Sequence, residues 1–178
     1  MEKRKWLVLS YNLPTEPSKH RVAVWRGLKK LGAVNIQQSM WLMTFSEENY
    51  SFLQKISQDI ETNNGASLLM ECSFYDEIHE QRVISLFNGQ RDEEYRELIN
   101  ECEKYLMELE KEISTEKFTF AELEEEEEEL RKLISWHRKI EARDLFVSSE
   151  ANAARNIIEK IENAFENYTD LVYRNCDK

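Results

Sequence analysis

Five cationic side chains gather within one short segment near the start of the chain. The segment "SKHRVAVWRGLKKL" (18–31) contains no acidic residue. At 100° per residue, a helix over this segment places Val24 and two leucines on one side and most of its Lys and Arg side chains on roughly the opposite side. An open face of this kind contacts phosphates, whereas the alternative is a solubilising face on a helix that covers a sheet. The predicted nucleic-acid or anion-binding residues are Lys19, Arg21, Arg26, Lys29 and Lys30.

Further positive charge flanks this segment, and one aromatic residue lies within it. Lys3, Arg4 and Lys5 precede it and are expected to add to the same basic region. Free backbone N–H groups at a helix start also favour anions. By its helical angle Trp25 lies between the apolar and the basic side. We expect Trp25 to pack against the protein or a partner, with stacking on a nucleic-acid base as the alternative.

Other patterns that carry chemistry are missing from the sequence. His20, His79 and His137 share no metal-ligand spacing, and the three cysteines (72, 102 and 176) are far apart. Neither a glycine-rich phosphate loop nor a GxSxG motif is found. The acidic run "EEEEEE" (124–129) is typical of a solvated helical face. We therefore predict no catalytic residue, no metal site and no cofactor, and expect the protein not to be an enzyme.

The charge of the chain is large and unevenly distributed. Its 178 residues carry a formal charge of -11, yet residues 1–33 contain eight Lys or Arg against two acidic residues. A protein that repels nucleic acid at long range can still dock phosphates on a local basic face. The apolar run "WLVL" is too short for a signal peptide or a membrane span, so a cytoplasmic protein without membrane contact is expected.

The order of expected elements predicts an α+β protein. Strands over 6–12, 34–37, 40–45 and 67–75 alternate with helices over 18–31 and 46–63. This β-α-β-β-α-β order indicates a ferredoxin-like domain at 1–77. A helical domain of about three helices is expected at 78–178. Helix starts are expected at Ser18, Ser46, the capping box "TFAE" (119–122) and Ser148 or Ser149, and Gly32 is expected as a helix C-cap. An open sheet leaves edges to be covered, which favours a homodimer.

Four segments give the sequence a family resemblance. In order they are "KWLVLSYNLPTEPSKHRVAVWRGLKKLGAV", "LFNGQRDEEYRELINECEKYL", "FTFAELEEEEEELRKL" and "WHRKIEARDLF". They resemble the N-terminal domain of the chromate-resistance regulator ChrB over nearly the whole chain. The resemblance implies a chromate-responsive regulator of a resistance operon. Together with the basic helix, this favours DNA as a partner in transcription regulation, and an oxyanion such as chromate is a further candidate ligand at the basic helix start. ChrB proteins have a further C-terminal domain, so any sensing that depends on it is not carried over.

The β-α-β-β-α-β segment is also similar to two other folds. It resembles the small CRISPR-associated endoribonucleases and the C-terminal domain of the phenylacetate repressor PaaX. The nuclease family has a Tyr-Asp pair where the first strand ends, and this sequence has Tyr11-Asn12. Because Mg²⁺ prefers carboxylate ligands to a neutral amide, the pair argues for a non-catalytic use of the scaffold. Three hypotheses follow, in order of preference: a DNA-binding regulator, a protein-interaction or dimerisation module that docks an acidic partner, and a divergent metal-dependent nuclease.

Overall fold

The computed structural model describes residues 3–176. The chain divides into two compact units, Met1–Phe87 and Asn88–Lys178. The boundary expected after residue 77 corresponds to the start of a long helix, whereas the two units divide within that helix. Each unit is described by itself.

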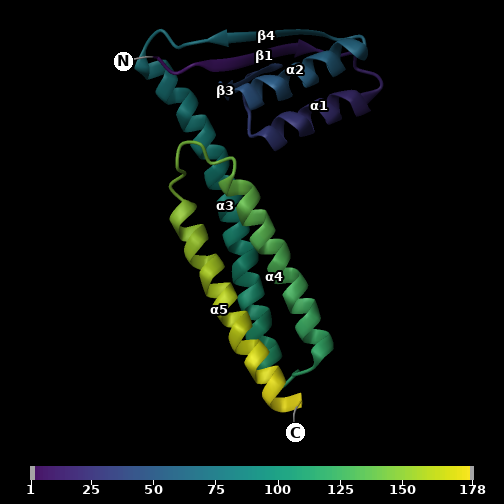
Figure 1. Cartoon of the computed structure of the whole chain (residues 1–178), viewed down its shortest axis with the longest axis vertical. Helices are drawn as coiled ribbons and strands as arrows, with labels where there is room; N and C mark the ends of the chain where they lie inside the picture. Colours follow the sequence, from purple (N-terminus) through teal and green to yellow (C-terminus); the bar gives the residue numbers. More distant parts are fainter. Residues whose placement is uncertain (1–2, 177–178) are drawn as a thin grey trace. The chain divides into compact units, whose positions relative to one another are not determined.

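The first unit is a four-stranded antiparallel sheet with two helices. Its elements are β1 (Trp6–Asn12), α1 (Ser18–Leu31), β2 (Val34–Gln37), β3 (Met40–Thr44), α2 (Glu47–Thr62) and β4 (Ala66–Cys72). The strand order in the sheet is β2-β3-β1-β4. Both helices lie on the same side of the sheet (Figure 1). The predicted α+β class is confirmed.

Helices α1 and α2 pack closely because small and apolar residues face each other. Val24 and Leu28 of α1 are buried, as are three residues of α2 at helical spacing: Leu53, Ile56 and Ile60. A Cβ atom added at Gly27 of α1 would lie 3.3 Å from Ile56 Cδ1. The opposite side of α1 is therefore left to face solvent.

Local signals in the sequence place most of the helix ends. The Ser46 side chain accepts a hydrogen bond from the Asn49 N–H at 3.0 Å, and Thr119 accepts one from the Glu122 N–H at 3.2 Å. Gly32 ends α1 in the left-handed region at φ 85°, which glycine adopts without strain. The prediction for Ser18 was wrong: α1 begins at Ser18 itself, after Pro17, and has no side-chain cap.

The fourth strand is shorter than the sequence predicts. It ends at Cys72 and not at residue 75. The Lys3 ammonium donates hydrogen bonds to the carbonyl oxygens of Phe74 (3.1 Å) and Tyr75 (3.0 Å). These two carbonyl groups are thus satisfied by a side chain, outside the ladder of the sheet.

The second unit is helical. Helix α3 (Glu77–Ser114) begins in the first unit and ends in this one, and α4 (Phe120–Glu141) and α5 (Ala151–Cys176) follow. Two buried tyrosines of its core have satisfied hydroxyl groups: Tyr105 donates to the Glu126 carbonyl at 3.1 Å and Tyr168 to the Lys117 carbonyl at 2.7 Å. Among the described residues, no helix has the length and apolarity needed to cross a membrane.

Candidate nucleic-acid interface

The five cations predicted from the sequence all lie on α1 and face away from the core. Lys29 is half-buried and the other four are exposed. Within residues 3–176, no ion pair or side-chain hydrogen bond engages any of the five. With no acidic residue on α1, their charge is not neutralised by their own helix. We call these residues the α1 cationic face: Lys19, Arg21, Arg26, Lys29 and Lys30.

The helical geometry arranges this face as two rows. Lys19, Arg26 and Lys30 fall within about 40° of one another around the helix axis, and they span about 16 Å along it. Arg21, Trp25 and Lys29 form a second row at four-residue spacing. Half of the Trp25 side chain is exposed, so Trp25 does not pack fully against the protein. An aromatic ring thus lies between two cations on an open surface.

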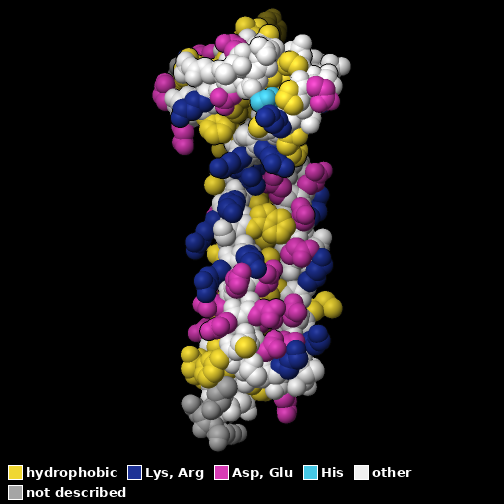
Figure 2. All heavy atoms as spheres, turned by 90° about the vertical axis from the view of Figure 1, so that its right-hand side faces the viewer, with side chains coloured by type: hydrophobic (Ala, Val, Ile, Leu, Met, Phe, Trp, Pro, Cys, Tyr) yellow, Lys and Arg dark blue, Asp and Glu magenta, His cyan; other side chains and the backbone are white. Residues whose placement is uncertain are grey.

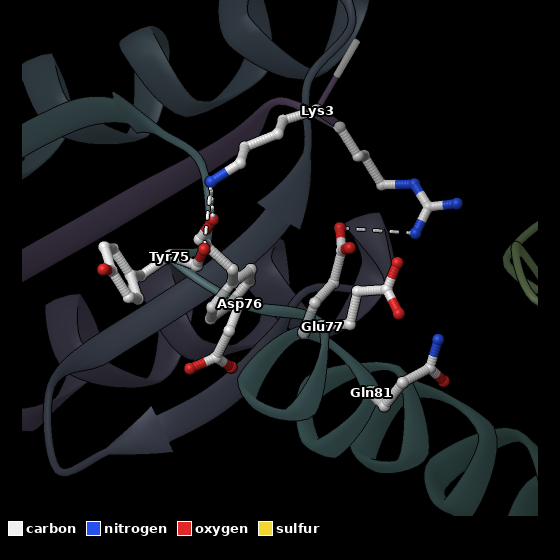
Figure 3. Close-up of a pocket in the computed structure, with 8 residues that line it drawn as sticks. Lys3, Tyr75, Asp76, Glu77 and Gln81 are labelled. Atoms are coloured by element: carbon white, nitrogen blue, oxygen red, sulfur yellow. Dashed lines mark hydrogen bonds and ion pairs between the residues drawn. The ribbon is translucent and has the colours of Figure 1, made fainter. Parts of the chain in front are cut away.

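The cations just upstream do not join this face. They precede β1, and each of them has a partner outside α1. Arg4 pairs with Glu80 at 3.5 Å, Lys5 pairs with Glu71 at 2.8 Å, and Lys3 binds backbone carbonyls. Figure 3 shows Lys3 reaching toward the turn between β4 and α3, beside a pocket of about 480 Å³ that Arg4 also lines. The expectation that residues 3–5 add to the basic helix is therefore wrong.

Part of the charge on α1 also stabilises the helix. Lys29 and Lys30 lie in its last turn, where positive charge interacts favourably with the helix dipole. The first turn has no acidic residue, so its free N–H groups carry no compensating negative charge. The interaction with the dipole applies to these two cations, whereas Lys19, Arg21 and Arg26 lie outside the last turn.

Charged side chains of the second unit are mixed in sign. Arg131 pairs with Glu127 at 2.9 Å and Lys132 with Glu128 at 3.1 Å, each across one turn of α4. Figure 2 shows Lys and Arg side chains interspersed with Asp and Glu over this unit. Segment 131–139 of α4 carries Arg131, Lys132, Arg138 and Lys139, and this charge is partly neutralised by acidic residues of the same helix, in contrast to α1.

One member of the acidic run contradicts the prediction of a solvated face. Glu126 is 5% exposed, whereas the other five glutamates of 124–129 are exposed. Burial raises the pKa of Glu126 to about 7, and nearby carboxylates, led by Glu108 and Glu112, add to the increase. Glu112 is also buried and pairs with Lys117 at 3.1 Å.

The sequence does not predict a partly buried ion network that lies in the second unit. Arg91 is 3% exposed and donates to Glu94 at 3.3 Å, and Arg143 donates to the other oxygen of Glu94 at 3.0 Å. Tyr95 donates to Asp144 at 3.3 Å, and burial lowers the pKa of Arg91. Two cations face two carboxylates, so the cluster is balanced in charge and joins α3 to the segment after α4. Arg91 and Glu94 are three residues apart on α3, whereas Arg143–Glu94 and Tyr95–Asp144 each join residues 49 apart, and no local spacing reveals these two contacts.

The Tyr11-Asn12 pair lies at the end of β1. Asn12 is exposed, and burial raises the pKa of Tyr11, an effect that a side-chain hydrogen bond with Trp41 partly offsets. In the described part of the chain, no three His, Cys, Asp or Glu side chains converge as a metal site would require. His137 is buried, and its ring lies 6.2 Å from the Tyr95 ring.

Comparison with known proteins gives a family match over most of the chain. Residues 21–178 match the family described as "Protein ChrB, N-terminal". A curated relative from Cupriavidus metallidurans, described as "Protein ChrB", is 30% identical over 92 residues. The aligned stretch covers 52% of this chain and 28% of that relative. No solved structure matches the chain.

Proposed function

The chain belongs to the family of ChrB N-terminal segments, and from that premise we propose a non-enzymatic regulator of chromate resistance that binds DNA through the α1 cationic face. We place this regulator in the cytoplasm, where it would act in transcription regulation. The strand order β2-β3-β1-β4, joined through α1 and α2, supports a ferredoxin-like fold for the first unit as its scaffold. The helical unit then forms a separate three-helix domain.

The observation that carries the proposal is the segregation of charge on α1. A chain with a formal charge of -11 repels DNA on average. The described surface nonetheless holds one helix with five cations, no acid and no ion pair. Each such cation that reaches a phosphate releases a condensed counterion, which favours binding at low salt.

The expected mode of binding is contact with phosphates. Phosphate contacts position a protein on DNA and carry no sequence information of their own. Lysine is a compact point charge and arginine is a planar fork, and both serve this purpose. We therefore expect sequence-tolerant affinity with a strong dependence on salt.

We expect the double substitution Arg26→Gln/Lys30→Gln to weaken the dependence of DNA affinity on salt concentration. If both side chains neutralise phosphates, the slope of log affinity against log salt concentration falls in magnitude by about 2. Fluorescence anisotropy with a labelled duplex, measured across a salt series, gives the slope.

A charge-matched variant tests whether the position of the charge matters. Lys111 and Lys160 are exposed on α3 and α5 and have no ion pair in the described residues. Lys111→Gln/Lys160→Gln removes the same charge and should leave the slope unchanged. Equal slopes for wild type and the α1 variant would remove Arg26 and Lys30 from the interface.

An acidic protein partner is the second candidate for the α1 cationic face. The exposed glutamates of 124–129 on α4 show that this chain itself presents such a surface. Self-association that salt disrupts, without a shift of any duplex in a gel, would favour this candidate.

Chromate is a third candidate ligand, and calorimetric titration with chromate and with sulfate shows whether oxyanion binding is selective. Cleavage assays with Mg²⁺ and Mn²⁺ test the nuclease alternative, for which Asn12 is the wrong residue type.

A further inference from the structure

Strand β4 forms an open edge of the sheet. It pairs with β1 over seven residues without a shift in register, and the strand order leaves its other side without a neighbouring strand in the described sheet (Figure 1). An open strand edge offers unpaired N–H and C=O groups to another chain.

The usual protections against such pairing are missing from β4. The strand "ASLLMEC" contains neither proline nor lysine and has no bulge. Its only charge is Glu71, which pairs with Lys5 at 2.8 Å. Leu68 is 56% exposed and Met70 is 38% exposed, and both point to the same face because they are two residues apart.

One register of self-pairing satisfies this edge. We propose that two copies of the chain pair antiparallel along β4, about a two-fold axis at Leu69. This axis places Leu68 of one copy opposite Met70 of its partner, so the two most exposed apolar side chains of the strand cover each other twice. It also places Glu71 opposite Ser67, which keeps the two glutamates apart. A second copy is therefore the occupant that fits both the apolar pair and the charge.

The pairing also sets the distance between the two α1 helices of the dimer. The meaning of this distance rests on the proposed function, whereas the pairing itself does not. A two-fold axis perpendicular to the sheet keeps the helices of both copies on one face. Helix α2 lies against β4, where Ser57 meets Ser67 at 2.6 Å, and α1 packs beside α2. Three helix spacings then separate the two α1 helices by roughly 30 Å, close to one turn of DNA.

The test is the oligomeric state of the full chain without nucleic acid. Sedimentation velocity over a concentration series should show a dimer for wild type. Leu68→Lys/Met70→Lys places like charges opposite each other twice and should raise the dimer dissociation constant at least about tenfold. Met107→Lys changes an exposed methionine on α3 and should leave the dimer dissociation constant unchanged. Arg26→Gln/Lys30→Gln should also dimerise as wild type does, which separates this proposal from DNA binding.

A cross-link tests the register directly. With Cys72 and Cys176 replaced by serine, Leu69→Cys should form a disulfide-linked dimer on mild oxidation, because directly opposite Cβ atoms lie about 4.5–5.5 Å apart. Leu68→Cys in the same background should not form this disulfide, because residue 68 lies opposite residue 70 of the partner copy and not opposite the partner's residue 68. A monomer at the highest soluble concentration, a dimer unaffected by the β4 lysines, or cross-linking at residue 68 instead of 69 would each overturn the proposal.

Discussion

Replacing Glu126 by glutamine is expected to raise the free energy of unfolding by about 2 kcal/mol at pH 8, after allowance for solvent screening. The substitution keeps the size of the side chain and removes a carboxylate that is 5% exposed. Burial is the main cause that raises its pKa from 4.5 to about 7, and Glu108 and Glu112 of α3 add electrostatic repulsion. Near neutral pH the folded protein therefore holds a charge that its surroundings disfavour.

The pH dependence of this effect has a definite sign. Between about pH 4.5 and pH 7 the folded state retains a proton on Glu126 that the unfolded chain has lost. Raising the pH through this window therefore favours unfolding, and the penalty is constant above it. Glutamine does not titrate, so the gain should vanish at pH 4.

Urea unfolding of both proteins at pH 4, 6 and 8 measures this difference. Glu125→Gln is the matched control, because Glu125 is the exposed neighbour on the same helix. Its stability should change by less than about 0.5 kcal/mol at every pH. A gain for Glu126→Gln that is equal at pH 4 and pH 8 would show that Glu126 does not titrate as inferred.

A signal for the burial of Glu126 was present in the sequence. The apolar positions Leu123, Leu130 and Leu133 of α4 follow helical spacing with one gap, and residue 126 fills that gap. Composition obscured it, because six consecutive glutamates are typical of a solvated surface. Periodicity and composition conflicted here, and the packing of α4 followed periodicity.

Short-range features of the fold were predictable for a physical reason. Alternation, helical spacing and the caps at Ser46 and Thr119 act within a few residues, so the sequence displays them directly. The α1 cationic face belongs to this class, since one helix carries all of it.

Long-range pairings were not predictable in the same way. Lys3 meets Tyr75 across 72 residues, and Arg143 meets Glu94 across 49. Only the fold brings such residues together, and no spacing in one sequence encodes the contact. The sequence therefore overestimated the basic region by including Lys3, Arg4 and Lys5, which the fold directs elsewhere.

Two of the three tryptophans of the first unit, Trp6 and Trp25, should separate stability from binding. Trp6 is fully buried, its ring contacts Phe74 edge-to-face at 5.6 Å, and its indole N–H donates to Glu80 at 2.9 Å. Trp6→Ala should lower the free energy of unfolding by about 3–5 kcal/mol. Trp25 is half exposed, so Trp25→Ala should change stability by less than about 1 kcal/mol.

For affinity to nucleic acid the order of the two tryptophans should reverse, so that substitution of Trp25 has the larger effect. A ring between Arg21 and Lys29 can stack on an unpaired base, which contributes about 1–3 kcal/mol per base. Trp25→Ala should therefore weaken binding of single-stranded DNA by about tenfold or more, and binding of a duplex by less, because duplex bases are already stacked. Trp6→Phe, which keeps a buried ring if Trp6→Ala fails to fold, should bind both as wild type does. Loss of stability in Trp25→Ala with unchanged affinity for single strands would instead assign Trp25 to packing, because a ring that stabilises the fold is not available to a base.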